Sequence, residues 1–286
     1  MRRRTWMTAG AGWLAGSVTR GATLRPRLRI GLTAVILADE AAFLARWAAY
    51  LGPRLGGEVV FLSRDEYQRL HDMLNAGQID ALWTCGYPYV RFRKQLHLLA
   101  VPLYHGRPTY QSYLIRHKGD ASIRGWPDLR GKVFAYSDPL SNSGWLVAQG
   151  ELAKVGIGPH DFKRSFFAHG HSHVAEAVAA RLADAGSIDG YVWETMRLQG
   201  MQAVAETEVI WKSQHHGFPP LVTAVNGWTP QARALQATLL AMGNDAEGRA
   251  LLQALNLDGF IAGSFADFES IYRLAGSVPG SGVEAG

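Results

Sequence analysis

Short apolar segments alternate with amphipathic ones along most of the chain. Leu28–Thr33, Glu58–Leu62 and Ile79–Trp83 are apolar runs of the length expected for buried strands. Asp39–Leu55 and Asp65–Ala76 lie between them and carry apolar residues at the spacing of one helix face. Strands that alternate with helices in this way indicate βαβ units and a mostly parallel sheet.

The same alternation returns after an apolar, extended segment, His97–Arg116. The expected elements are a strand over Lys132–Tyr136, a helix over Ser143–Val155, a strand over Lys163–Ala168, a helix over Ser172–Leu182 and a strand over Ile188–Val192. Three more helices follow, over Thr229–Met242, Asp245–Ala254 and Ala266–Leu274. The pattern predicts two α/β lobes of similar size, and a cleft between lobes is a common place for a small ligand.

Composition excludes several classes of protein. The chain has 286 residues, of which 48% are hydrophobic and 19% charged, a balance typical of globular proteins and not of disordered chains or coiled coils. No apolar run reaches the roughly 18 residues of a membrane span. The single cysteine, Cys85, excludes an internal disulfide and zinc sites built from several cysteines.

The basic character of the chain is concentrated at its start. The net charge is +5, and Arg2, Arg3, Arg4 and Arg20 account for four of these charges, which leaves 5 − 4 = +1 for the remainder. Nucleic-acid binding therefore gains little support. Basic residues before a short, weakly apolar stretch predict an export signal over residues 1–22, similar to a twin-arginine signal. A frayed basic terminus or an uncleaved anchor is the alternative.

A loop rich in small polar residues is the most informative local feature. A predicted strand is followed by Ser137-Asp138-Pro139, then by Ser141-Asn142-Ser143-Gly144, and then by a predicted helix. Free N–H groups at a helix start, together with hydroxyl donors, can hold an anion through uncharged hydrogen bonds. Simple capping of the helix by Ser141 or Ser143 explains the same pattern, and the residues alone leave both interpretations open.

Six stretches together carry a family resemblance. They are GQIDALWTCGYPYV (Gly77–Val90), PTYQSYLI (Pro108–Ile115), SDPLSNSGW (Ser137–Trp145), FAHGHSHVAEAV (Phe167–Val178), IDGYVWE (Ile188–Glu194) and NDAEGRALLQALNLDGF (Asn244–Phe260). In order and spacing the chain resembles the periplasmic phosphate/phosphite/phosphonate-binding proteins of ABC importers, from Leu28 to Leu274. The resemblance implies a two-lobe type II periplasmic binding-protein fold with mixed, mostly parallel sheets and a ligand cleft between the lobes.

The resemblance and the pattern together give expected boundaries. They are lobe I over 28–108 plus 211–274, lobe II over 109–210, crossing segments near Tyr110–Arg116 and Glu206–Lys212, and a flexible Gly/Ser-rich tail over 275–286.

The resemblance implies binding residues in the second lobe. The family's small-hydroxyl loop falls on Ser141, Asn142 and Ser143, although a threonine often stands where this chain has Asn142. The family's histidine at the next strand–helix junction falls on His171, which can donate to an oxyanion. An acidic family residue falls on Glu194, which would accept the O–H of a monoprotonated phosphonate and repel sulfate, or would pair with an ammonium group.

Three further positions complete the implied site. Tyr87 lies in the first-lobe loop that faces the ligand, and Tyr110 and Ser112 lie where the chain approaches the crossing between lobes. The tyrosines would wall the pocket with apolar surface and one donor each.

The implied function is capture of a small oxyanion, with phosphonate, phosphate or phosphite first, by an exported protein without a cofactor. This protein, expected to be a monomer, would deliver its ligand to an ABC permease in the inner membrane. Alternatives are another solute, such as a sulfur oxyanion or a vitamin precursor, and a sensing module that feeds a membrane histidine kinase. An enzyme would need a Ser143, His171 and Glu194 set, and the chain lacks Walker A, GxSxG and HExxH motifs.

Local interpretations remain for some polar residues. His169, His171 and His173 would share one side of a strand, but the strand is expected to end near Ala168, so no metal site is predicted. Asp189 is interpreted as a strand-edge or turn residue and not as a ligand group.

Overall fold

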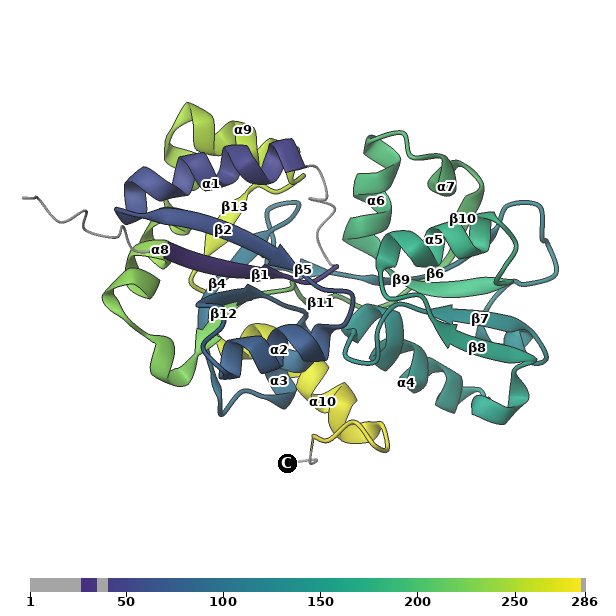
Figure 1. Cartoon of the computed structure of the whole chain (residues 1–286). Coiled ribbons are helices and arrows are strands. Elements are labelled where there is room, and N and C mark those ends of the chain that lie inside the picture. The colour runs from purple at the N-terminus through teal and green to yellow at the C-terminus, as the bar shows by residue number, and fades with distance from the viewer. Residues whose placement is uncertain (1–26, 35–40, 284–286) are drawn as a thin grey trace, which may run out of the picture.

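Two α/β lobes are joined by a narrow pair of crossing strands (Figure 1). The computed structural model describes residues 27–34 and 41–283. We call residues 27–108 and 218–283 lobe I, and residues 112–212 lobe II. The predicted export signal lies outside the described residues.

Lobe I is built on a six-stranded sheet with the spatial order β13-β4-β12-β3-β1-β2. Its strands are β1 (Arg27–Leu32), β2 (Glu58–Ser63), β3 (Ala81–Trp83), β4 (Leu96–Leu103), β12 (Leu221–Ala224) and β13 (Gly259–Ile261). Its helices are α1 (Ala41–Leu55), α2 (Tyr67–Asn75), α3 (Gly86–Arg91), α8 (Pro230–Leu240), α9 (Ala246–Ala254) and α10 (Glu269–Ser277).

Lobe II is built on a five-stranded sheet with the order β10-β6-β9-β7-β8. Its strands are β6 (Ser112–His117), β7 (Val133–Tyr136), β8 (Arg164–Phe167), β9 (Ala185–Asp189) and β10 (Thr207–Lys212). Its helices are α4 (Val147–Lys154), α5 (His171–Ala179), α6 (Gly190–Leu198) and α7 (Gln202–Ala205).

Both sheets are mixed, as predicted. The sequence also predicted that they are mostly parallel, and the structure does not show this. In lobe I, β1 pairs in parallel with β2 and β3, whereas β12, β4 and β13 join antiparallel. In lobe II, β7 pairs in parallel with β8 and β9, whereas β6 and β10 join antiparallel. Periodicity identifies βαβ units, but strands that enter a sheet from the crossing between lobes carry no local signal of their direction.

The crossing itself is a two-stranded ribbon of β5 (Thr109–Tyr110) and β11 (His216–Gly217), which lies between the lobes in Figure 1. The sequence predicted the first crossing later in the chain, over Tyr110–Arg116, and the second crossing earlier, over Glu206–Lys212. Most of those residues instead form β6 and β10, which pair with each other inside lobe II. Their apolar, extended pattern is shared by a sheet strand and a buried connection, so the sequence could not separate the two.

The core of lobe I is aromatic. Phe43, Trp47, Tyr50 and Leu51 of α1 are buried, at the spacing of one helix face. The Trp47 ring stacks on the Phe61 ring of β2 with centroids 4.8 Å apart. Fully burying one such side chain contributes about 1.5–3 kcal/mol. The sheet is therefore held against α1, and the carboxyl ends of its parallel strands keep a fixed place beside lobe II.

The C-terminal segment is packed where the sequence predicted a flexible tail from residue 275. Helix α10 continues to Ser277, and Val278 and Ser281 are buried. The hydroxyl of Ser281 donates to the carbonyl of Ala275 at 2.6 Å. Gly and Ser content suggested disorder, but these small residues allow a tight turn against the lobe. Across the described residues, no helix combines the length and apolar character needed to cross a bilayer.

Candidate functional site

The loops at the ends of β7 and β9 face lobe I from lobe II. The two strands are parallel neighbours, so the loops after Tyr136 and Asp189 emerge at the same sheet edge. On the lobe I side, the segment after β3 brings Cys85 to the same place, where its sulfur accepts the backbone N–H of Asn142 at 3.2 Å. Open α/β sheets bind ligands at such carboxyl-terminal edges.

The small-residue loop contains a helix cap and also open polar groups, by which we mean buried polar atoms without a hydrogen-bond partner among the described residues. The hydroxyl of Ser141 accepts the N–H of Gly144 at 3.0 Å, so this serine caps a π-helical turn, Asn142–Leu146, that leads into α4. The hydroxyls of Ser137 and Ser143 are buried and have no hydrogen-bond partner among residues 27–34 and 41–283. The capping that the sequence allowed for Ser141 or Ser143 therefore belongs to Ser141, and the hydroxyl of Ser143 takes no part in it.

Two serines of neighbouring strands hold this loop in position. The hydroxyls of Ser112 and Ser187 donate to the carbonyl of Ser143, at 2.7 and 2.6 Å. Ser112 was expected to touch the ligand directly, but its hydroxyl is used inside the protein. Supporting bonds of this kind fix the rotamers and the backbone of a binding loop.

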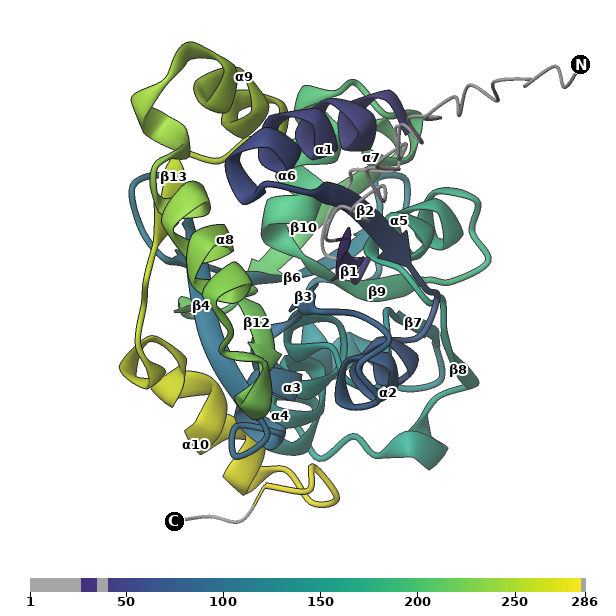
Figure 2. The same cartoon turned by 60° about the vertical axis from the view of Figure 1, so that its left-hand side comes forward.

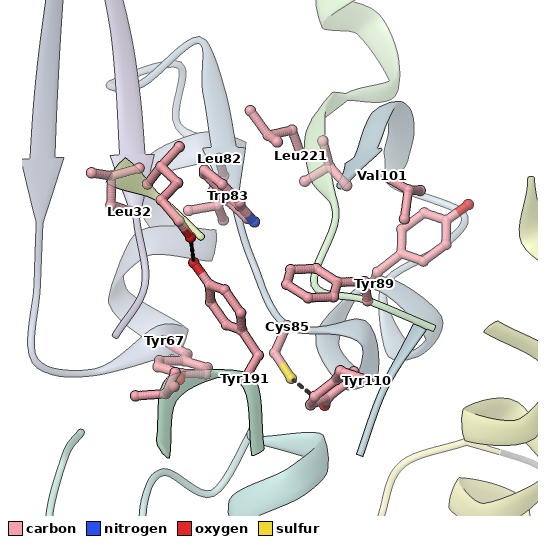
Figure 3. Packing of buried hydrophobic residues seen from close by; sticks show 14 of the residues in the cluster. Leu32, Tyr67, Leu82, Trp83, Cys85, Tyr89, Val101, Tyr110, Tyr191 and Leu221 are labelled. Atoms are coloured by element: carbon pink, nitrogen blue, oxygen red, sulfur yellow. Dashed lines mark hydrogen bonds between the residues drawn. The ribbon is translucent and has the colours of Figure 1, made fainter. Parts of the chain in front are cut away.

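Asn142, Tyr110 and Cys85 form a buried polar group across the lobe boundary. The amide Nδ2 of Asn142 donates to the Tyr110 hydroxyl at 3.0 Å, and its Oδ1 is buried without a partner. The Cys85 sulfur lies 3.9 Å from the same hydroxyl, as the dashed line in Figure 3 marks. Burial raises the pKa of the Cys85 thiol to about 11, so the thiol is neutral and brings no charge to the site.

His171 offers one buried donor. Its Nδ1 accepts the backbone N–H of Asp189 at 3.1 Å, and burial lowers the pKa of the ring to about 3. The ring is therefore neutral near pH 7, and its single proton is on Nε2, because Nδ1 is an acceptor. Nε2 is buried, and no described residue accepts its proton. The histidine that the sequence selected is a neutral donor and not a cation.

Asp189 supplies the acidic group. Its Oδ1 caps α6 by accepting the N–H groups of Tyr191 and Val192, at 2.8 and 3.2 Å, and its Oδ2 is buried without a partner. Burial raises the pKa of this carboxyl to about 8, although the two backbone bonds oppose that rise. Its charge also contributes to the raised pKa values of Cys85 and Tyr110, so these groups lie near one another.

Glu194 lies elsewhere. It is one turn further along α6, where its carboxylate accepts from Tyr113 at 3.4 Å and pairs with Arg197 at 2.9 Å. It lines a groove of about 630 Å³ beside the crossing of β5 and β11, together with Tyr104 and Tyr191. Two buried acidic residues lie at the serine loop: Asp138, whose two oxygens accept the N–H groups of Tyr67 and Leu140, and Asp189, whose Oδ2 has no partner among the described residues. The signal that identifies Asp189 is its position as the last residue of β9, directly at the sheet edge.

The first-lobe tyrosine with an open hydroxyl is Tyr67 and not Tyr87. The Tyr87 hydroxyl donates to the carbonyl of Ser281 at 2.6 Å, and the Tyr87 ring stacks on Trp145 of lobe II. The hydroxyl of Tyr67, at the start of α2, is buried and forms no hydrogen bond to a described residue. Burial raises the pKa of this hydroxyl well above its usual value, and the nearby Asp138 and Asp189 add to the rise. Figure 3 shows the buried aromatic group that includes Tyr67. Tyr67 was missed because it fits the apolar face of its helix.

Neutral donors surround one acidic acceptor in this group. The open donors are the hydroxyls of serine and tyrosine and the histidine N–H, and the open acceptors are Asp189 Oδ2 and Asn142 Oδ1. No three His, Cys, Asp or Glu side chains among residues 27–34 and 41–283 are grouped to hold a metal ion. The arrangement suits a compact ligand that accepts several hydrogen bonds and donates at least one.

Two α/β lobes that meet around buried polar groups have the architecture of a two-lobe binding protein. A family model described as the phosphonate-binding periplasmic substrate-binding protein of ABC transporters matches residues 31–268. The chain belongs to this family, whose members are transport components and not enzymes. The resemblance read from the sequence is thereby confirmed.

Two curated relatives match part of the chain. The phosphate-import protein PhnD of Mycolicibacterium smegmatis is 30% identical over 176 residues, 57% of this chain and 55% of that protein. The phosphonates-binding periplasmic protein of Escherichia coli (strain K12) is 31% identical over 175 residues, 59% of this chain and 51% of that protein. The chain spans about half the length of these relatives.

Solved structures match nearly the whole fold. A binding protein component of an ABC phosphonate transporter from Pseudomonas aeruginosa has a TM-score of 0.78 and 23% identity, covering 87% of this chain and 85% of that one. PhnD1 from Prochlorococcus marinus, in complex with methylphosphonate, has a TM-score of 0.76 and 18% identity, covering 87% and 97%. The type II periplasmic binding-protein fold predicted from the sequence is confirmed.

Proposed function

We propose that this protein is an exported solute-binding protein that captures a small phosphorus oxyanion between its lobes and delivers it to an ABC permease. The observation that carries the proposal is a group of buried polar atoms that have no partner in the part of the chain that the structure describes. They belong to Ser137, Ser143, His171, Tyr67 and Asp189. Buried polar atoms are nearly always paired in folded proteins, so such a group at a lobe boundary marks a place where a ligand supplies the partners.

The balance of donors and acceptors favours a monoprotonated oxyanion. The hydroxyls of Ser137, Ser143 and Tyr67 and the Nε2–H of His171 donate to the unprotonated oxygens. Asp189 keeps its proton up to about pH 8 in the ligand-free protein, so a monoprotonated ligand that bonds to Oδ2 requires this carboxyl to release its proton on binding. The ionised Oδ2 then accepts the remaining P–O–H, whereas sulfate has no proton to donate and would place bare oxygens against the carboxylate. In its ionised form Asp189 therefore selects phosphate and phosphonates and disfavours sulfate.

Binding would be coupled to closure of the lobes. Two contacts already join them beside the site: the Tyr67 N–H donates to Asp138 Oδ2 at 3.2 Å, and the Asn142 N–H donates to Cys85. The ligand would add bonds to both lobes at once, because Tyr67 belongs to lobe I and the other groups belong to lobe II. Contacts made only in the closed arrangement shift the population toward it.

The relatives support the ligand class and the partner. The Escherichia coli relative is a phosphonates-binding periplasmic protein, and the Mycolicibacterium relative is a phosphate-import protein. We propose that the protein acts as a monomer. It would meet its permease outside the cytoplasm, and the predicted export signal would bring it there. A direct check on export replaces Arg2, Arg3 and Arg4 by lysine. The twin-arginine route requires that the precursor then stays in the cytoplasm, whereas unchanged export points to another route.

Isothermal titration of ligand-free protein tests the binding site. We expect phosphate, phosphite or methylphosphonate to bind, and sulfate to bind far more weakly. Ser143→Ala and Asp189→Asn should each weaken binding about tenfold or more, since each removes a bond to a charged ligand worth roughly 1.5–3 kcal/mol. Glu194→Gln and the exposed Asp65→Asn serve as matched controls and should bind as the wild type does. Loss of binding in Glu194→Gln alone would overturn the choice of Asp189.

A further inference from the structure

The lobes also touch along the C-terminal helix, which contacts α4 and the turn before it. We propose that Leu274 on α10, Gly150 on α4 and the stacked pair Tyr87 and Trp145 form a latch that holds the closed state and thereby sets ligand affinity. The inference rests on the proposed function, because closure matters to affinity only if the ligand binds between the lobes.

Helix α10 belongs to lobe I but reaches lobe II. It packs against α3 of its own lobe and against β11 of the crossing, and it also contacts α4 and the turn before it. Figures 1 and 2 both show α10 running beside α3 toward α4. A helix in this position must separate from one lobe whenever the two lobes move apart.

Gly150 lies against the end of a lobe I side chain. A Cβ atom at this position would lie 2.7 Å from Leu274 Cδ1 and 4.0 Å from Leu274 Cγ, so the end of the Leu274 side chain would have to move to admit it. Gly150 stands inside α4, where glycine costs about 1 kcal/mol relative to alanine. The close contact with the other lobe gives a physical reason for glycine at a position that a helix alone would disfavour.

The second half of the latch is aromatic and is held by the C-terminal segment. The Tyr87 ring of lobe I lies parallel to the Trp145 ring of lobe II, with centroids 5.9 Å apart and planes 19° apart. The Tyr87 hydroxyl donates to the carbonyl of Ser281, and Ser281 is itself fixed by Ala275 and by the N–H of Val283. Residues 278–283 therefore hold Tyr87 in the orientation that stacks on lobe II.

These residues act on closure and not on the ligand. Among the described residues, neither Tyr87 nor Trp145 has a buried polar atom without a partner that a ligand could contact. Gly150 and Leu274 have no polar side chain. If a fraction f of the ligand-free protein is closed, the apparent Kd is the closed-state Kd divided by f. The latch raises f. Because the ligand enters the open arrangement and is held by the closed one, loss of the latch should weaken affinity mainly through faster dissociation.

A wedge in the latch tests this inference. Gly150→Leu places a bulky side chain between the lobes, and Ala153→Leu adds the same bulk on the exposed side of α4 as a matched control. Tyr87→Phe removes only the bond to Ser281, and a chain ending at Ser277 removes the whole segment. Thermal unfolding checks that each variant is folded, and Tyr87→Phe keeps the test valid if the wedge prevents folding.

Small-angle X-ray scattering of ligand-free protein is the first readout. We expect a larger radius of gyration for Gly150→Leu and for the shortened chain than for the wild type and Ala153→Leu. Stopped-flow binding of phosphate and methylphosphonate is the second. Dissociation should be about tenfold faster in Gly150→Leu, with association changed far less.

Unchanged scattering together with unchanged dissociation in Gly150→Leu and in the shortened chain would overturn the latch. If the wild type bound neither probe, the proposed ligand class would fail, and the scattering comparison would still decide on the latch.

Discussion

Replacement of Asp189 by asparagine should change the pH dependence of stability by a calculable amount. Burial raises the pKa of this carboxyl to about 8 in the folded protein, against about 3.9 in an unfolded chain. Between these values the folded protein keeps a proton that the unfolded chain has released. The contribution of Asp189 to stability is therefore complete below about pH 4 and is lost as the pH rises through about 8.

The size of this effect follows from one proton. Where the folded state binds one proton more than the unfolded state, the free energy of unfolding falls by about 1.4 kcal/mol for each pH unit. Asp189→Asn removes this term and leaves the other titrating groups in place. The stability of the variant relative to the wild type should therefore rise by about 2.7 kcal/mol between about pH 5 and about pH 7.

Urea unfolding of ligand-free wild type and Asp189→Asn at several pH values measures this difference. The exposed Asp65→Asn is the control and should follow the wild type at every pH. Parallel pH profiles for wild type and Asp189→Asn would refute the reasoning, because they would mean that Asp189 is already ionised in the folded protein at about pH 5.

Three further substitutions test the loop, the first-lobe tyrosine and the core. In Gly144→Ala, the new Cβ would lie 1.8 Å from Ser137 Oγ, so titration calorimetry should find phosphate binding lost in a folded protein, and normal binding would contradict the loop geometry. Tyr67→Phe removes a hydroxyl without a partner, so the melting temperature should hold while phosphate affinity falls about two- to tenfold; an unchanged affinity would remove Tyr67 from the site. Trp47→Ala should cost about 3–5 kcal/mol in urea unfolding, and a loss below about 1 kcal/mol would contradict its place in the core.

Periodicity was sufficient to predict the two lobes and most of their elements. Helix α1 and strand β2 lie close to the segments that the apolar pattern indicated, because each buries one face against the same core. Strand direction and the crossings were not predictable in this way. β6 and β10 have the same apolar, extended pattern as a buried connection, and their pairing is decided by contacts distant in sequence.

The site was predictable where local chemistry is unusual. A run of small polar residues between a strand and a helix identified the loop at Ser141–Ser143, and the structure places His171 beside the same sheet edge. Asp189 was missed because an acidic residue at a strand end also fits a helix cap, and it does cap α6 with one of its two oxygens. A helix cap and a ligand group are distinguished here only by Asp189 Oδ2, which is buried without a partner among the described residues. Burial of one oxygen depends on the tertiary structure and is not visible in the sequence.

The most direct test of the account is a crystal structure of the protein with phosphate or methylphosphonate. The account predicts the phosphorus between the lobes, with oxygens within hydrogen-bond distance of Ser143 Oγ, His171 Nε2 and Tyr67 Oη, and one oxygen on Asp189 Oδ2. An anion bound instead in the groove beside Glu194 and Arg197, or bound without contact to Asp189, would contradict it.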